Sequence, residues 1–536
     1  MAFLDDIELH LKAGVSAIYV ESSEWGRFHA DIEECCTKVD KTLCCWNKMD
    51  HLSYIIKPRE ESNNDLSDVD LNDFDLSEFT NVLKYLAKGG LKDTVCVLEL
   101  VDSHLQDAEA AEQFAVMLRK LPLHKSHVVI LSPVLNIPKI LEREFAVLDL
   151  SLPGRGDIRT LLTNEAKKYK ISSPDDANPI LDAVRGLGAT EIRNAFAKAA
   201  VQYGGITAEE IPFLIAEKEQ IIRKTGYLTF VRTDEKMDSV GGLIELKKWL
   251  RTRKHAFGKK AREAKLNAPK GVLLLGVPGT GKSLCAKAVA REWKMPLLRL
   301  DMGSIFSSGV GDSEANMRNA IKTAEGLAPC VLWIDEIEKG VSGSTGGELD
   351  GGTSMRVFGS FLTWMQEKQK EVFVFATANN IARLPPEMLR KGRFDEIFFV
   401  DLPGTEERKK IFKIHLSRKR QTLESIDIDK LARETEGFSG SEIETIVNEA
   451  LFTSYESVHK GGKTPVVSET NLLEEKSKIT PLSATMKETI GDLRKWAKSR
   501  CRKASDSNEE PKAKNLNIGV SLRTEMYNPF KKDKNK

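Results

Sequence analysis

Short apolar runs alternate with segments of helical spacing along most of the chain. Residues 272–275 (VLLL) are too few for a helix and predict a buried strand, and residues 283–293 behind them place apolar side chains at helical spacing. Two further apolar runs, within 329–336 and 372–378, predict further buried strands. Strands that alternate with helices in this way favour an α/β fold with parallel sheets.

The pattern also divides the chain into four parts. A first block is followed by a Gly-rich block of strands and helices, then by a mostly helical block, and finally by a stretch in which Lys, Asn, Glu and Ser replace the apolar residues. A polar stretch of that kind is typical of a disordered tail. We therefore predict domains at 1–236, 237–400 and 401–502, and a disordered tail at 503–536.

Composition and charge exclude several classes of protein. The chain has 536 residues, and 80 Lys and Arg against 79 Asp and Glu leave a formal charge of +1, so no overall field attracts nucleic acid or an anionic membrane. No run reaches the roughly 18 apolar residues of a membrane helix, and the acidic start does not resemble a signal or transit peptide. We expect no membrane partner and a cytoplasmic location, or the plastid stroma if the gene is plastid-encoded.

The eight cysteines predict a reducing compartment rather than a disulfide scaffold. Two doublets, Cys35–Cys36 and Cys44–Cys45, are conceivable zinc ligands. Adjacent cysteines on a strand point to opposite faces, however, and the usual two-residue gap is missing, so we expect small core residues instead.

A glycine-rich segment connects the strand at 272–275 to the following helix. Its glycines allow several N–H groups to point at an anion, and the helix presents its positive end to the same place. Lys282 can bridge the β- and γ-phosphates of ATP, and Ser283 can hold Mg²⁺. The predicted nucleotide-binding residues here are Gly276, Val277, Pro278, Gly279, Thr280, Gly281, Lys282, Ser283 and Leu284.

Polar residues follow the next two buried strands. Asp335 and Glu336 end one of them, at the edge of a parallel sheet where the phosphate loop also lies. Asp335 is expected to hold the magnesium with Ser283, and Glu336 to polarise the attacking water. Asn379 ends the other strand and could orient that water.

With these motifs in place, the chain resembles the AAA ATPases. VGGL at 240–243, the phosphate loop, the acidic strand, the Asn strand, RKGRFD at 390–395 and GFSGSEI at 437–443 occur in the family's order. The resemblance covers residues 238–455. It implies one three-layer α/β/α domain with an intact phosphate loop, followed by a helical lid; two tandem AAA-like three-layer domains are expected only if the first block repeats this pattern in degenerate form.

The resemblance also implies roles for matching residues. Asn379 stands at the γ-phosphate sensor position, and Arg390 and Arg393 match arginine fingers that reach a neighbouring subunit's site, which implies a homo-oligomer, by resemblance a hexamer. A surface basic turn is the alternative for the arginines. An adenine pocket is implied, although an isolated His is ordinarily structural. The implied catalytic residues are Lys282, Asp335, Glu336, Asn379, Arg390 and Arg393, and the implied adenine-pocket residues are Val240, Gly241, His415, Gly440 and Ser441.

Two departures bear on mechanism. Substrate-threading members of the family carry an aromatic residue before the VG of a central loop, and Gly309 stands there in this chain. The zinc-protease motif HExxH of some members is absent from the sequence.

The first block parallels the second. GLGATEI at 186–192 matches GFSGSEI, and LPG at 152–154 matches LPG at 402–404, which predicts a duplicated AAA-like fold. Its phosphate loop is replaced by a stretch that contains Glu21, Glu24 and Arg27, and we expect Leu100 and Val101 in place of the paired acids, so this copy is predicted not to hydrolyse ATP. Over residues 1–503 the chain most resembles the plastid-encoded and cyanobacterial AAA proteins of the hypothetical chloroplast reading-frame type.

These observations predict an ATP-driven remodeller of a protein or assembly that acts as a ring on an unidentified protein partner. A nucleotide-dependent switch or scaffold is the alternative, and Gly309 favours it slightly. A nucleic-acid motor is the least favoured function because the overall charge is neutral.

Overall fold

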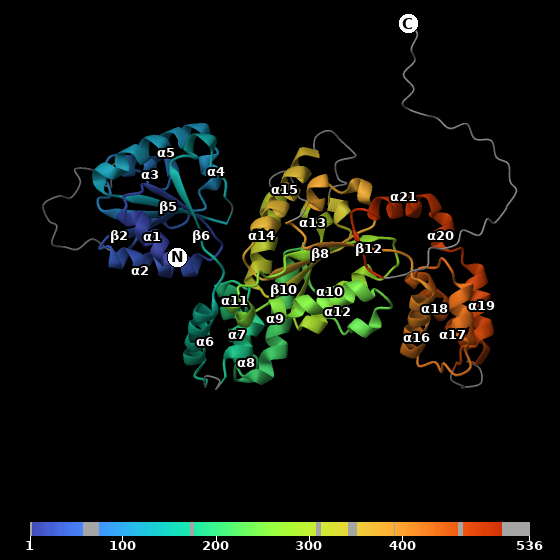
Figure 1. The fold of residues 1–536 in the computed structure, drawn as a ribbon. Coiled ribbons are helices and arrows are strands. Elements are labelled where there is room, and N and C mark those ends of the chain that lie inside the picture. Colours follow the sequence, from blue (N-terminus) through green and yellow to red (C-terminus); the bar gives the residue numbers. More distant parts are fainter. Residues whose placement is uncertain are drawn as a thin grey trace, which may run out of the picture.

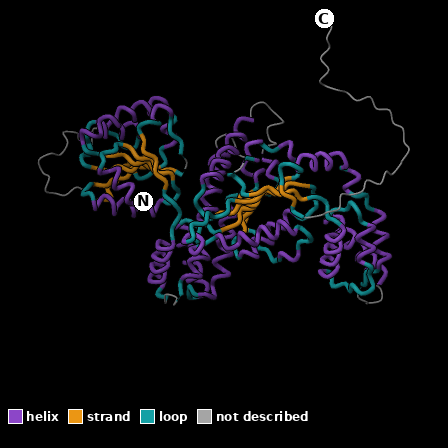
Figure 2. Tube along the Cα trace, in the orientation of Figure 1, coloured by secondary structure: helices purple, strands orange, loops and turns teal. Residues whose placement is uncertain are grey.

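The computed structural model describes residues 3–56, 74–133, 135–171, 176–306, 312–340, 351–390, 392–458 and 465–505. Gly309 and residues 506–536 of the predicted tail lie outside these ranges. Figure 1 shows two sheet units beside one another, with a group of helices joined to each, and Figure 2 shows that helices flank each sheet. The expected α/β class, with two AAA-like sheet units and a helical lid, is confirmed.

The first unit has a six-stranded sheet with the order β3-β2-β4-β5-β1-β6, in which only β3 is antiparallel. Ile7 and Phe28, from α1 and α2, pack with Ile18 on one face, and Val82 and Phe114, from α3 and α5, pack on the other. The elements are β1 (Ala17–Glu21), β2 (Thr42–Asn47), β3 (His51–Ile56), β4 (Thr94–Glu99), β5 (His127–Ser132), β6 (Phe145–Asp149), α1 (Phe3–Lys12), α2 (Trp25–Lys38), α3 (Phe79–Ala87), α4 (Asp102–Leu105) and α5 (Ala108–Lys120).

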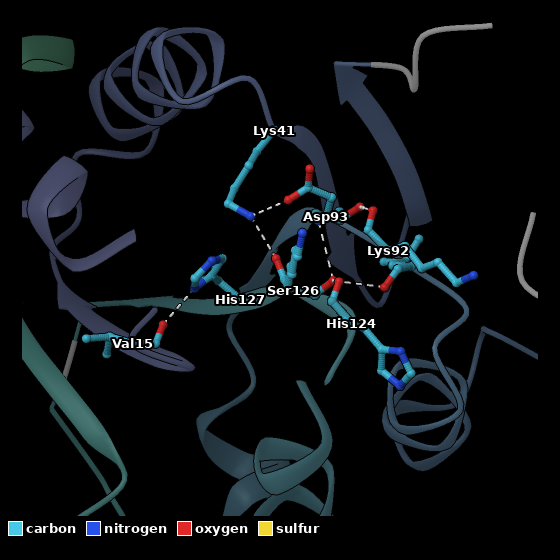
Figure 3. A network of polar contacts seen from close by, with 10 residues as sticks. Val15, Lys41, Lys92, Asp93, His124, Ser126 and His127 are labelled. Atoms are coloured by element: carbon cyan, nitrogen blue, oxygen red, sulfur yellow. Dashed lines mark hydrogen bonds and ion pairs between the residues drawn. The ribbon is translucent and has the colours of Figure 1, made fainter. Parts of the chain in front are cut away.

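Polar side chains close the amino edge of this sheet (Figure 3). Lys41 Nζ donates to Asp93 Oδ1 at 2.5 Å and to the Lys125 carbonyl at 2.7 Å. His127 Nδ1 donates to the Val15 carbonyl at 2.7 Å, and burial lowers the pKa of His127, so the ring is neutral. These groups satisfy backbone carbonyls, which leaves the carboxyl edge as the place for a ligand.

Four helices follow the first sheet and share their own apolar core, which includes Ile158, Phe196 and Leu214. They are α6 (Arg155–Tyr169), α7 (Asn178–Val184), α8 (Ala189–Tyr203) and α9 (Ile211–Lys224). Ile222 of α9 belongs to the core of the second sheet unit instead, so these helices connect the two units.

The second unit has a seven-stranded sheet with the order β13-β12-β8-β11-β10-β9-β7, in which β7 is antiparallel. Helices α10 and α12 cover one face and α14 and α15 the other. The elements are β7 (Leu228–Phe230), β8 (Gly271–Gly276), β9 (Leu297–Leu300), β10 (Cys330–Ile334), β11 (Val372–Ala378), β12 (Glu396–Val400), β13 (Arg502–Lys503), α10 (Ile244–Arg253), α11 (Lys259–Glu263), α12 (Lys282–Trp293), α13 (Met302–Phe306), α14 (Asp312–Gly326) and α15 (Gly351–Glu367).

The helical lid has a separate core around Phe412, Ile443 and Leu472. After it, the chain returns to the second sheet, because Leu493 of α21 packs on Phe399 and β13 pairs with β12. The lid and C-terminal helices are α16 (Thr405–Arg418), α17 (Ile428–Glu434), α18 (Gly440–Val458), α19 (Glu469–Lys478), α20 (Leu482–Thr485) and α21 (Lys487–Ala497).

The strand registers superimpose the two sheets residue by residue and correct one expectation. Leu148 and Phe398 each lie four residues before the shared LPG, so they are equivalent starting points for following the strand pairs across the two sheets. In the first sheet, Leu148 pairs with Val20, Val20 with Leu131, and Leu131 with Glu99. In the second sheet, Phe398 pairs with Leu274 and Leu274 with Thr377, and Asp335 is level with Thr377 because Ile334 pairs with Ala376. Leu100 and Glu336 follow with matching positive φ angles of 54° and 51°. Glu99 and Leu100 therefore occupy the positions of Asp335 and Glu336, and the expectation of Leu100 and Val101 was wrong by one residue.

The connecting helices touch the second unit through a close contact at Gly186, between α7 and α8. A Cβ atom there would lie 2.5 Å from Leu327 Cγ of the second unit, and Gly186 has a φ of +85°. Gly204 has a similar φ of +73°, but an added Cβ there would have nothing within 4 Å. A substitution at Gly204 therefore measures the cost of backbone strain without the cost of crowding.

Alanine at these two glycines should separate strain from crowding. Both substitutions place a side chain in the left-handed region, at about 1–2 kcal/mol each. We expect Gly186→Ala to lower the free energy of unfolding by about 1–3 kcal/mol more than Gly204→Ala, because it overpacks the buried Leu327 contact. Urea unfolding followed by fluorescence measures both, and equal losses would contradict the contact.

Candidate active site

The phosphate loop runs from β8 to α12 and has no room for side chains at two of its glycines. A Cβ at Gly276 would lie 1.9 Å from the Val400 carbonyl oxygen. Gly279 has a φ of +73°, and its Cβ would lie 2.2 Å from Ser441 Oγ. The loop therefore passes against β12 on one side and against lid helix α18 on the other.

Lys282 is the first residue of α12 and is buried. Its Nζ atom donates to the carbonyls of Gly276 at 3.0 Å and Val277 at 2.7 Å, both in the loop itself. Burial lowers the pKa of Lys282 to about 8, although nearby carboxylates act in the opposite direction. An anion in the loop would favour the charged ammonium and draw Nζ away from these carbonyls.

Asp335 joins three segments of the site. Its Oδ1 atom accepts hydrogen bonds from Ser283 Oγ at 2.8 Å and from Thr377 Oγ1 at 2.6 Å. Thr377 lies on β11, between β8 and β10 in the sheet. A carboxylate and hydroxyls are oxygen ligands of the kind that Mg²⁺ takes, so this group fits a magnesium ion.

Glu336 and Asn379 are joined by a hydrogen bond from Asn379 Nδ2 to Glu336 Oε1 at 2.8 Å. The Asn379 backbone N–H donates to Glu338 Oε1 at 2.8 Å, which fixes the end of β11. Asn379 Oδ1 is buried and accepts no hydrogen bond from the residues that the structure describes. A buried acceptor without a donor is expected where a water or ligand hydroxyl binds.

These groups line one cavity of about 500 Å³ between the second sheet and the lid. The lining brings together the following predicted residues: Val240, Gly241, Pro278, Gly279, Thr280, Gly281, Lys282, Ser283, Leu284, Asp335, Glu336, Asn379, His415, Gly440 and Ser441. Gly276 and Val277 lie behind it, where they accept from Lys282. Volume and lining fit a nucleotide.

Sequence reasoning missed several lining residues. Thr377 is one, and its position two residues before Asn379 could have suggested it. The others, Glu235, Ser239, Ile411, Ile414, Arg418 and Glu444, come from the linker and the lid and match no phosphate motif. His415 Nδ1 lies 3.7 Å from Glu444 Oε1, and burial lowers the pKa of His415, so a neutral ring faces the cavity.

Arg390 and Arg393 do not line this cavity. Arg393 donates to the Glu387 carbonyl, and the nearby Asp395 N–H donates to the Gly271 carbonyl at 2.9 Å. Gly271 begins β8, and the phosphate loop follows the end of this six-residue strand. The length of that strand, about 20 Å, separates the arginine segment from the loop.

In the first unit, protein groups occupy the place that corresponds to the phosphate loop. Only residues 22–24 connect β1 to α2, whereas 277–281 connect β8 to α12. Glu24 Oε2 accepts from the Ala189 N–H at 2.6 Å, at the start of α8. Its carboxylate therefore occupies the helix terminus that corresponds to Gly440 and Ser441 of the lid.

Comparisons with known proteins match four segments of the chain. Residues 272–402 match the ATPase family associated with various cellular activities (AAA), and residues 425–466 match the AAA+ lid domain. Residues 3–150 and 156–225 match the N-terminal and second domains of SpoVK-like AAA ATPases.

Individual relatives are similar over most of the chain. The "Uncharacterized AAA domain-containing protein ycf46" of Pyropia yezoensis is 41% identical over 76% of this chain and 82% of its own length. The protein of that name from Guillardia theta is 35% identical over 93% of this chain and 95% of its own length. A "Cell division cycle protein 48 homolog" of Archaeoglobus fulgidus is 29% identical over 62% of this chain and 48% of its own length.

Lys282→Ala should abolish ATP binding by the full-length protein, because it removes the cation in the phosphate loop and we expect no second nucleotide site in the first unit. Lys287→Ala, on the same helix but outside the cavity lining, should bind normally. Calorimetric titration with ATP measures both. Micromolar affinity that survives in Lys282→Ala would place a nucleotide in the first unit.

Glu336→Gln should retain ATP and hydrolyse it at least ~10²-fold more slowly, the scale of a lost general base. The amide keeps the size of the side chain and removes only its charge. Glu367→Gln, an exposed position on α15, makes the same charge change away from the cavity and should leave turnover unchanged. Steady-state phosphate release and nucleotide retention measure the two effects, and normal turnover in Glu336→Gln would exclude Glu336 as the base.

Proposed function

The chain belongs to the AAA ATPase family, and from this premise we propose that it binds ATP with Mg²⁺ and hydrolyses it to remodel a protein or assembly as a homo-oligomeric ring. The observation that carries the hydrolytic part is the Asn379–Glu336 hydrogen bond, which holds the proposed base beside Asn379 Oδ1, a buried oxygen with no hydrogen-bond partner among the described residues. A water molecule that donates one hydrogen bond to the Glu336 carboxylate and one to Asn379 Oδ1 would be oriented and polarised there.

The proposed roles follow from position in the cavity. Lys282 binds the β- and γ-phosphates, while Ser283 and Asp335 hold the magnesium, which neutralises charge on the phosphates. Asn379 senses the γ-phosphate and orients the water for Glu336. Val240, Gly241, His415, Gly440 and Ser441 surround the adenine end, and we add Thr377 as the residue that orients Asp335.

Work on a partner requires that the nucleotide state change the shape of the protein. The cavity supports this because its walls belong to two bodies with separate cores, the second sheet unit and the lid. The Ser441 N–H donates to the Gly279 carbonyl at 3.0 Å, so the lid helix α18 contacts the phosphate loop directly. A nucleotide bound between the two bodies can therefore shift the angle of the lid.

The ring follows from the arginines. Arg390 and Arg393 lie about one strand length from the phosphate loop of their own chain, which is too far for a direct contact. An arginine that acts on ATP from this position must act on a neighbouring subunit, and each cavity is then complete only in the oligomer. By family resemblance we propose a hexamer.

A switch or scaffold is the second candidate, in which ATP binding alters the affinity for a partner and hydrolysis resets it. Gly309 favours it because glycine cannot grip a threaded peptide, and a partner that raises ATP turnover would favour the remodeller. None of the helices within the described ranges is long and apolar enough to cross a membrane. The likeness to the ycf46 proteins supports a location in the cytoplasm or, for a plastid-encoded chain, in the stroma.

Mixing two inactive variants tests the shared site. Arg393→Ala should bind ATP nearly normally and hydrolyse it at least ~10³-fold more slowly. Mixed with Lys282→Ala, it should recover partial activity, because some interfaces pair an intact phosphate loop with an intact finger. The wild-type specific activity should also rise with protein concentration as rings form.

The control is a mixture of Lys282→Ala with Glu336→Gln, which leaves one defect in every cavity and should recover no activity. Phosphate release over a range of protein concentrations measures all mixtures. A concentration-independent ATPase without rescue would mean that one subunit holds the whole site.

A further inference from the structure

The carboxyl edge of the first sheet carries a cluster of three metal-binding side chains. His29 comes from α2, Cys45 from β2 and Glu99 from the end of β4, and their nearest ligand atoms all lie within 4.8 Å of one another. His29 Nε2 lies 2.5 Å from Glu99 Oε1. Within the described ranges, this is the one group of three or more His, Cys, Asp or Glu residues that could share a metal ion.

The cluster lies at the position in the first sheet that corresponds to the proposed magnesium site of the second. Glu99 occupies the position of Asp335, the proposed magnesium ligand, by strand register. Asp335 is surrounded by hydroxyls, whereas Glu99 is beside an imidazole and a thiol. Oxygen ligands suit Mg²⁺, but a set of one nitrogen, one sulfur and one oxygen suits Zn²⁺ and similar ions.

The cluster is supported by neighbouring side chains and is partly open to solvent at His29 and Glu99, while Cys45 is buried. Asn47 Nδ2 donates to Glu99 Oε2 at 3.3 Å and to Asp50 Oδ2 at 3.1 Å, and Asn47 Oδ1 accepts from the Asp50 N–H at 2.8 Å. The side chains of His29 and Glu99 are 29% and 15% exposed. Glu99 is therefore held by a neighbour of the kind that orients metal ligands, and an ion can reach it.

We infer that His29, Cys45 and Glu99 bind a zinc-class divalent cation at the edge where the second unit is built for magnesium. Ligands of one tetrahedral ion lie about 3.4–3.7 Å apart, so His29 Nε2 and Glu99 Oε1, which lie 2.5 Å apart, must separate slightly when the ion binds. The thiol proton of Cys45 leaves to solvent as the sulfur–metal bond forms. A water or Asp50 completes the coordination. The ion would fix α2, β2 and β4 to one another, and this inference is independent of ATP hydrolysis in the second unit.

The cysteine doublets provide the matched control. Cys44 and Cys45 are adjacent on β2, but Cys44 packs in the core on the opposite face of the sheet. Cys44→Ser and Cys45→Ser therefore make the same chemical change in neighbouring positions, and only the second removes a proposed ligand. Cys501 is the one partly exposed cysteine among the described residues, so Cys501→Ser controls for adventitious binding by a surface thiol.

The experiment titrates full-length, chelator-treated protein with Zn²⁺ alone and with Co²⁺ alone. We expect one Zn²⁺ per chain, and affinity at least ~10-fold lower in Cys45→Ser, His29→Ala and Glu99→Gln. Cobalt should produce a thiolate-to-metal charge-transfer band in the wild type, in Cys44→Ser and in Cys501→Ser, but not in Cys45→Ser. Lys282→Ala protein should bind zinc normally, which separates this site from the nucleotide site.

Two results would overturn the inference. One is equal zinc affinity in the wild type and in Cys45→Ser, and the other is a cobalt–thiolate band that survives in Cys45→Ser. Should Cys45→Ser fail to fold, His29→Ala decides by itself, because the ring is partly exposed and can be removed at less cost in packing than a buried side chain, and unchanged zinc affinity there would exclude the site. The three side chains would then form only a hydrogen-bonded cluster.

Discussion

The carboxylate of Asp335 is the group on which the arrangement of the candidate active site depends. Its Oδ1 atom accepts hydrogen bonds from the hydroxyl of Ser283, on the helix after β8, and from that of Thr377, on β11. Asp335 itself follows β10. These strands are neighbours and run parallel, so their ends meet at one edge of the sheet. Hydrogen bonds to an ionised carboxylate are roughly twice as strong as neutral ones, so this junction fixes the phosphate loop relative to Glu336 and Asn379.

The first unit shows what the same fold does when that junction is lost. Strand order and register are retained, and even the left-handed residue after the acid is retained as Leu100. The hydroxyl partner on the neighbouring strand is not, because Leu131 stands in the position of Thr377. Without Thr377 the acid has no orienting hydroxyl from that strand, and without a glutamate after it the edge has no base. A parallel sheet therefore preserves the position of a site after its chemistry has changed.

Much of this could be predicted from the sequence because the second unit carries its chemistry in contiguous motifs. The glycine spacing of the phosphate loop and the two acids after a strand each predict local geometry, and the structure places both at one cavity. Arg418, Ile414 and Glu235 could not be predicted in this way, since they reach the cavity from the lid and the linker and match no phosphate motif. The one-residue error at Glu99 arose because the apolar residues of the two corresponding strands can be aligned in either of two registers. Only the pairing with neighbouring strands shows which register is correct.

Glu21, one of the acids that stand in place of a phosphate loop in the first unit, contacts the second unit together with Asp149. Lys322 of α14 lies 2.9 Å from Asp149 Oδ1 and 3.8 Å from Glu21 Oε1, at the ends of β6 and β1. Such partly exposed pairs contribute at most about 1 kcal/mol each, so they orient the contact more than they stabilise it. The stabilising part is apolar, at Gly186 against Leu327 and at Ile222 in the core of the second sheet unit. Because α14 touches the first sheet and also packs in that core, a shift of this helix would be felt by both units.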